Sequence, residues 1–159
     1  MAVLSAGTAY AASEACCDSA ESLLQAIDKN GGQSIVHGLG YDEVDKILSH
    51  IETGDPKWLA VAGKLAPYAD AGFGEGLGIA LATALPVAPQ EVLTLAGKEP
   101  PLSLSIICGL PFIEPDTEFL KNYISKTRKA LEATTTPDLQ QKKAECLKQI
   151  NTPPIASDN

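Results

Sequence analysis

Aromatic residues are scarce in this sequence. It has one Trp, four Tyr and three Phe among 159 residues, so only 5% of the chain is aromatic although 45% is apolar. The core must therefore be built from Leu, Ile, Val and a large amount of Ala. Because Ala has the highest helix propensity and adds little to a pleated sheet face, this composition predicts closely packed helices. A chain of this length suits one domain with a core of its own.

Basic residues are also few. Lys and Arg number 12 against 20 Asp and Glu, which gives a net charge of −8. An acidic surface repels phosphate backbones and anionic lipid headgroups, so we expect neither nucleic acid nor a membrane surface as a partner. A basic protein partner or a cationic ligand is electrostatically permitted, although the same charge also serves to keep a protein in solution.

Long apolar runs are missing as well. The apolar stretch 76–89 is too short to span a bilayer and follows Glu75, so we expect no membrane span. Residues 1–11 are small, apolar and uncharged, and they end in Ala9-Tyr10-Ala11, the pattern that signal peptidase leaves before its cut.

These features divide the chain into three parts. Residues 1–11 are predicted to be a signal-peptide remnant, with a disordered apolar N-terminus as the alternative. Residues 12–150 form a single helical domain that would be periplasmic or secreted. Residues 151–159 hold two prolines and small polar residues and are predicted to be a flexible tail.

The four cysteines suit an exported protein. Cys108 ends an apolar segment and Cys146 lies on the apolar stripe of the last predicted helix, so we expect a disulfide between them. The chain-entropy model values such a link at roughly 4 kcal/mol. The neighbours Cys16 and Cys17 are badly placed for a mutual disulfide. They could bridge within the pair, pair between chains or stay reduced.

Motifs for catalysis, metals and cofactors are lacking. A redox site would favour Cys-x-x-Cys, and a zinc site needs more ligands than His37 and His50 supply. The glycine-rich run 72–78 does not have the spacing G-x-G-x-x-G, and no strand pattern precedes it. The sequence therefore predicts no enzyme, no metal and no cofactor.

Helical periodicity dominates the chain, with Asp, Pro and Gly as start and stop signals. The segment 33–41 lies between two predicted helices, contains Gly38 and Gly40, and is predicted to be a loop. The pattern predicts an all-α fold of about eight helices, either an orthogonal bundle or, since no fixed period is seen, an irregular HEAT- or armadillo-like array. The predicted helices are 14–29, 42–53, 56–66, 70–85, 89–96, 102–109, 115–133 and 138–150.

Small residues recur every four positions at Gly74, Gly78 and Ala82. They lie on one side of the predicted helix 70–85, where a neighbouring helix can approach closely. Glycines lower helix stability, so their presence indicates either a packing constraint or a groove that faces a partner.

Aromatic and acidic residues near the loops form the candidate partner-binding set. Tyr41 and Tyr68 lie at loop edges beside Asp42 and Asp70. Trp58 lies at the start of the helix 56–66 and ordinarily anchors a core, but exposed it would join the same set. Our hypothesis is that five residues form a binding site for a basic partner: Tyr41, Trp58, Tyr68, Asp70 and Glu75.

Two segments carry a resemblance to a known group. They are Gly54-Asp55-Pro56-Lys57-Trp58-Leu59, followed by Leu65-Ala66-Pro67 and Asp70-Ala71-Gly72, and the later Cys108-Gly109-Leu110-Pro111-Phe112-Ile113-Glu114. The chain resembles, over about residues 50–150, small exported helical proteins of proteobacteria that are largely uncharacterised. The resemblance implies a helical fold and export, and it brings no catalytic residues. The chain is similar to some periplasmic immunity proteins in class only, as a small, helical, disulfide-bonded protein, and shares no motif with them.

The function expected from these observations is a non-enzymatic periplasmic or secreted protein-interaction module, such as an inhibitor, an immunity protein or an adaptor. The alternative is a carrier of a small apolar ligand in the Ala/Gly-rich groove near residues 72–85.

Overall fold

A computed structural model gives the structure of the chain and describes residues 17–151. The described part is all-α, as predicted, with nine α-helices and short connections. The predicted signal remnant, Cys16 and residues 152–159 of the predicted tail lie outside the described residues. The elements are α1 (Ala20–Asn30), α2 (Gly32–Gly38), α3 (Tyr41–Glu52), α4 (Pro56–Leu65), η2 (Ala66–Tyr68), α5 (Ala71–Ala84), α6 (Pro89–Leu95), α7 (Leu104–Ile107), α8 (Thr117–Glu132), η3 (Pro137–Leu139) and α9 (Gln140–Ile150).

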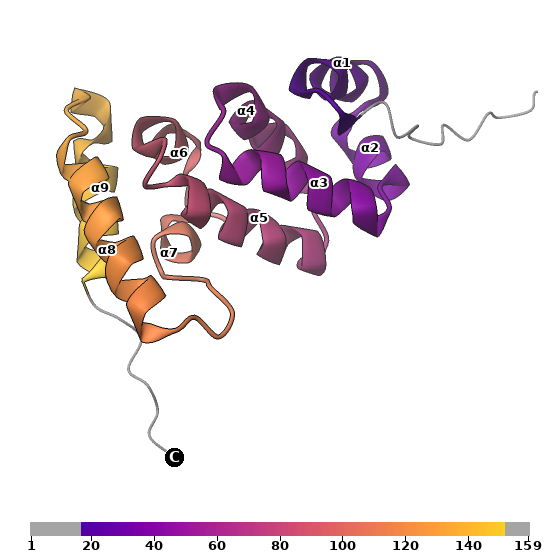
Figure 1. Ribbon diagram of the computed structural model, residues 1–159. Coiled ribbons are helices and arrows are strands. Elements are labelled where there is room, and N and C mark those ends of the chain that lie inside the picture. The colour runs from indigo at the N-terminus through magenta and orange to yellow at the C-terminus, as the bar shows by residue number, and fades with distance from the viewer. Residues whose placement is uncertain (1–16, 152–159) are drawn as a thin grey trace, which may run out of the picture.

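The helices stack in two layers along the molecule. In one layer α3 packs on α5, α5 on α7 and α7 on α9; in the other α1 packs on α4, α4 on α6 and α6 on α8. Figure 1 shows the order running from α1 and α2 at one end to α8 and α9 at the other. Because most helices pack on the next but one, the arrangement is closer to the expected helical array than to an orthogonal bundle. The apolar core lies between the layers.

Side-chain caps begin the helices where the sequence predicted them. The carboxylate of Asp70 accepts a hydrogen bond from the Phe73 N–H at 2.8 Å, and that of Asp116 accepts from the Phe119 N–H at 2.7 Å. Each bond satisfies a backbone donor that the first helical turn leaves unpaired. Asp55 caps α4 in the same way, with Pro56 in the first turn.

The loop predicted at residues 33–41 is wrong, because α2 occupies most of it. Ile35 is buried, and Val36 and Leu39 pack against the core. A single residue, Gly31 with a φ of 83°, separates α1 from α2. The glycines in this segment indicated a loop, but burial of its apolar side chains outweighs their low helix propensity. The next helix, α3, begins at Tyr41, one residue before the predicted start at 42.

The disulfide between Cys108 and Cys146 is confirmed, with an S–S distance of 2.02 Å. It joins the end of α7 to α9 across 38 residues of sequence. The predicted helix 102–109 is shorter than expected, since α7 covers only Leu104–Ile107. A helix of one turn is unstable alone, so α7 depends on its neighbours. Cys17 is buried just before α1.

Ion pairs run along the contact between α1 and α4. Lys57 pairs with Glu21. Lys64 pairs with Asp28, two helical turns further along both helices. The hydrogen bond from Lys57 lowers the pKa of the Glu21 carboxyl. All four side chains are largely exposed, so these pairs orient the helices more than they stabilise them.

Helix α5 packs very closely on two neighbours. A Cβ atom added to Gly78 would lie 2.6 Å from Ile106 Cγ2 of α7, and one added to Gly76 would lie 2.6 Å from Leu48 Cδ1 of α3. Both distances are far below ordinary contact, so these glycines allow the approach. The packing expected along the small-residue stripe is therefore confirmed at Gly78.

Loss of the disulfide should cost substantial stability. Replacing both Cys108 and Cys146 by Ala should lower the free energy of unfolding by about 4 kcal/mol, because the unfolded chain regains the entropy of the open loop. Chemical denaturation of both proteins measures the difference. A reducing agent should lower the stability of the wild type to that of the variant and leave the variant unchanged. Equal stability of the oxidised wild type and the variant would contradict this.

The glycines of α5 should respond in opposite ways to Ala. Gly78→Ala should lower the free energy of unfolding by about 1–2 kcal/mol, because the new Cβ displaces Ile106. Gly74→Ala is the matched control, since its Cβ would meet Pro101 at 3.7 Å, an ordinary contact. That control should raise the free energy of unfolding by about 0.5–1 kcal/mol. Thermal and urea unfolding of the two variants would test this, and a gain in both would contradict the packing argument.

Candidate functional site

Two open grooves flank the beginning of α5. The first, here named the α3–α5 groove, has a volume of about 630 Å³. Its floor is apolar and comes from α2, α3 and α5: Val36, Leu39, Val44, Leu48 and Phe73. Its rim is formed by Gly40, Tyr41, Asp45, Asp70 and Gly72.

The second groove, here named the proline groove, has a volume of about 660 Å³. Prolines and alanines form most of its walls: Ala66, Pro67, Ala69, Ala71, Pro100, Pro101 and Pro111. Ile106, Gly74, Asp70 and Glu75 complete it. The loop that supplies Pro100 and Pro101 is closed at its base, where the Gly97 N–H donates to the Leu102 carbonyl at 2.7 Å.

The charged residues of both grooves are all acidic. Asp45 and Asp70 line the α3–α5 groove, Asp70 and Glu75 line the proline groove, and no Lys, Arg or His is among the described lining residues. Asp70 also caps α5, whose N-terminus carries about half a positive charge. One full carboxylate outweighs that half charge, so the surroundings stay negative.

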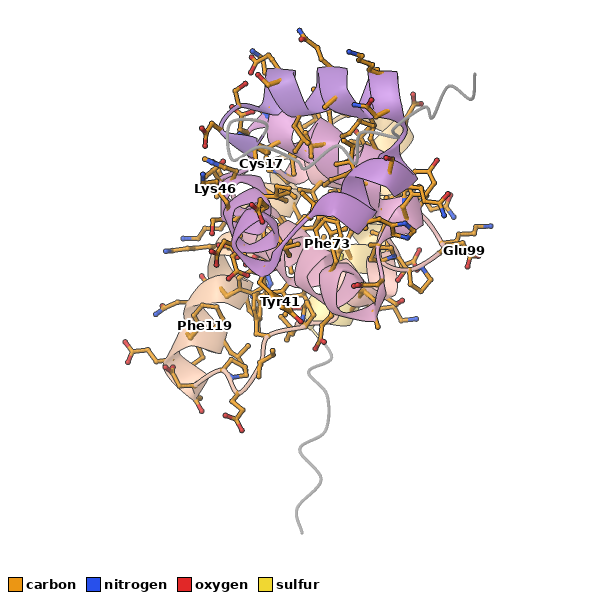
Figure 2. The ribbon with its side chains drawn as sticks, turned by 90° about the vertical axis from the view of Figure 1, so that its right-hand side faces the viewer. Cys17, Tyr41, Lys46, Phe73, Glu99 and Phe119 are labelled. Carbon is orange, nitrogen blue, oxygen red and sulfur yellow. A yellow bond between two sulfur atoms is a disulfide. The ribbon has the colours of Figure 1, made fainter. Side chains whose placement is uncertain are left out.

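Three of the five predicted partner-binding residues come together here. Asp70 lies in both grooves, Glu75 in the proline groove and Tyr41 at the rim of the other. Tyr41 is 93% exposed, which is unusual for a large aromatic side chain. Figure 2 looks onto this end of the molecule and shows Tyr41 and Phe73 on the same face.

The other two predicted residues lie elsewhere. Trp58 is only 7% exposed and stacks on His50 with ring centroids 4.4 Å apart, so it belongs to the core. Tyr68 is half-exposed and lines a separate hollow with His37 beside the turn between α1 and α2. Neither lines the two grooves.

Several groove residues were not expected from the sequence. Val36 and Leu39 belong to the segment taken for a loop, and their spacing with Ile35 was an available sign of a helix. The packing of α7 against α5 brings Pro101 and Ile106 to the proline groove. No local sequence pattern predicts on which helix α7 packs.

The expected ligand groove along residues 72–85 is open only at its beginning. Beyond Gly76, Ile106 covers Gly78, and the Tyr123 hydroxyl donates to the Ala82 carbonyl at 2.7 Å. Burial raises the pKa of Tyr123 to about 12, while the Thr127 side chain beside it acts in the opposite direction. The rest of the stripe is therefore interior.

Between residues 17 and 151 no group of three or more His, Cys, Asp or Glu side chains could hold a metal ion. Within the same range, no helix is both long and apolar enough to cross a membrane.

Comparisons with known proteins return no similar protein. No protein-family model matches the chain, and neither a curated protein nor a solved structure matches it.

Tyr123 should make stability fall at high pH. Its pKa is about 12 in the folded chain against 10.0 for the free side chain, so its contribution is complete below pH 10 and is lost as the pH rises toward 12. The loss should be on the order of 2–3 kcal/mol. Urea unfolding of wild type and Tyr123→Phe between pH 8 and 12 would measure it.

The Phe variant lacks the hydrogen bond to Ala82 and should be less stable by about 1 kcal/mol at pH 8. Its deficit should shrink and then reverse as the pH rises toward 12, because only the wild type has a buried hydroxyl to ionise. A constant difference between the two proteins over the whole range would contradict the shifted pKa.

Proposed function

We propose that this protein is a non-enzymatic interaction module that binds a basic segment of another protein at the α3–α5 and proline grooves. The observation that carries this proposal is that two apolar grooves share Asp70 and that every charged residue lining them is acidic. Apolar floors supply affinity, and rim carboxylates select a partner of opposite charge.

The shape of the grooves favours a protein partner. Their volumes, about 630 and 660 Å³, fall in the range of ligand sites, but both are open to solvent. A carrier of a small apolar ligand would bury most of its ligand's surface. Open grooves instead suit side chains that project from a larger partner.

The distribution of charge supports the same choice. Lys and Arg gather in α8 and α9, whereas the helices before them carry mostly carboxylates. In that earlier part Lys57 and Lys64 are engaged with carboxylates of α1. The end of the array that holds the α3–α5 groove is therefore the acidic one, and it attracts a basic partner over a distance of about a Debye length.

An exported location supports an inhibitor, immunity protein or adaptor as the form this module takes. Disulfides persist in oxidising compartments such as the periplasm, and Cys108–Cys146 is buried and structural. The resemblance to small exported helical proteins points the same way.

A random library of 12-residue peptides tests the proposal. Peptides selected by the protein should carry net positive charge and at least one large apolar side chain, and they should bind less tightly as salt rises. Asp70→Asn with Glu75→Gln should weaken a selected peptide about three- to tenfold, as expected for rim charges. Asn still caps α5, so the helix is kept. Affinities come from fluorescence titration.

The matched control is Glu132→Gln with Asp138→Asn, which removes the same charge near the other end of the array, at residues that line neither groove. It should leave affinity within about twofold. Selection of acidic peptides, or of none, would overturn the proposal. Self-association that Asp70→Asn and Glu75→Gln abolish would assign the grooves to a second copy of the chain instead.

A further inference from the structure

One face of α3 forms a wall of the α3–α5 groove. Its lining residues have the spacing i, i+3, i+4 and i+7 of a single helical face: Tyr41, Val44, Asp45 and Leu48. The two aliphatic side chains belong to the floor, and Tyr41 and Asp45 lie beside them at the rim. Residues four apart on a helix have Cβ atoms about 5–6 Å from each other, so an aromatic ring and a carboxylate are neighbours at this rim.

A second carboxylate reaches the same groove from another helix. Asp70 precedes α5, and its Oδ1 accepts a hydrogen bond from the Phe73 N–H at 2.8 Å. A carboxylate has a second oxygen, which can accept from a bound group. Lys46, which follows Asp45 in α3, is bonded to Asp18 at 2.8 Å and is not among the described lining residues. The rim therefore offers two carboxylates, one from α3 and one at the start of α5.

The exposure of Tyr41 adds a second preference for positive charge. The residue is 93% exposed at the edge of a groove whose floor includes Phe73, which is 5% exposed. The Tyr41 ring is therefore almost entirely in contact with water. An open aromatic face attracts a cation that lies within about 6 Å of the ring centre.

An apolar floor below a cation-binding rim matches the structure of one long basic side chain. Arg and Lys have a methylene stem and a charged end, and they bury the stem on apolar surface while the end stays near water. A purely apolar side chain would cover the floor and leave the carboxylates of Asp45 and Asp70 without a partner. A short polar side chain would reach neither part of the groove fully.

Resting on the function proposed above, we infer that the α3–α5 groove binds a single arginine side chain of the partner. Its stem lies on the apolar floor, and its guanidinium stacks on Tyr41 and donates to the carboxylates of Asp45 and Asp70. A guanidinium is planar and carries five donors in a fixed fork, so it stacks on a ring and bonds to a carboxylate at the same time. The ammonium of Lys is a compact, strongly hydrated charge and gains less from an aromatic face. The groove therefore selects Arg over Lys.

Four single-residue probes test this inference: the N-acetylated amides of arginine, lysine, citrulline and norleucine. Citrulline has the shape of Arg without its charge, Lys has the charge without the planar fork, and norleucine has only an apolar chain. In ¹⁵N NMR titrations at millimolar concentration, the arginine probe should shift the amides of Tyr41, Asp45 and Gly72. It should bind about three- to fivefold more tightly than the lysine probe. The two uncharged probes should bind at least about fivefold more weakly than the arginine probe.

Loss of the aromatic ring should remove the preference for Arg. Tyr41→Leu should weaken the arginine probe about three- to fivefold and the lysine probe by less than about twofold, because both carboxylates remain. Tyr68→Leu is the matched control, since Tyr68 is half-exposed and lines a separate hollow, and it should change neither affinity by more than about twofold. Leu favours a helix more than Tyr does, so α3 is kept, and circular dichroism checks this.

The results separate this inference from the proposed function. Equal affinities for the arginine and lysine probes, or a preference for arginine that Tyr41→Leu leaves unchanged, would overturn the arginine site and leave the acidic grooves as a site for basic segments. Shifts confined to Gly74 and the other residues of the proline groove would also overturn it. If the arginine probe shifts no groove amide, the inference is wrong, and the proposed function fails with it only if the library yields no basic peptide.

Discussion

The close approach of α5 to its neighbours is the constraint on which the rest of the structure depends. Gly76 lets Leu48 of α3 approach one side, and Gly78 lets Ile106 of α7 approach another. The helix is stable despite these glycines because its other positions, such as Leu77 and Leu81, are completely buried. Packing of this density fixes both neighbours, and with them the walls of the two grooves.

The short helix α7 shows how far this constraint extends. One turn of helix has no stability of its own, yet α7 lies between α5 and α9, held by Ile106 on one side and by the Cys108–Cys146 bond on the other. The loop before it carries Pro100 and Pro101 to the proline groove. The two cysteines line neither groove, yet their bond holds the helix that contributes Ile106 to the proline groove. Its role in the site is positional, acting through α7.

Local signals made most of the fold predictable, and tertiary contacts decided the rest. Asp55, Asp70 and Asp116 were readable as caps because a cap depends on residues two or three positions away. Helix α2 was missed because burial, rather than propensity, stabilises it. The same limit applies to the site: Asp70 and Glu75 were proposed from charge and position, but spacing could not distinguish Gly78, which is covered by α7, from Gly74, which lines the proline groove.

The rim carboxylates and the apolar floor residues of the grooves would have different roles in the proposed binding. Asp45, Asp70 and Glu75 are exposed at the rims, where water and salt screen them, so in the proposed function they would act mainly on the rate of association and on the choice of partner. The apolar floors would lose contact only when the proposed partner leaves, so they would act mainly on the rate of dissociation. The proposed binding would therefore disfavour acidic segments at the rim before the apolar floors are contacted. It would also require no rearrangement of the helices, because the close packing of α5 on α3 and α7 already fixes the walls of both grooves.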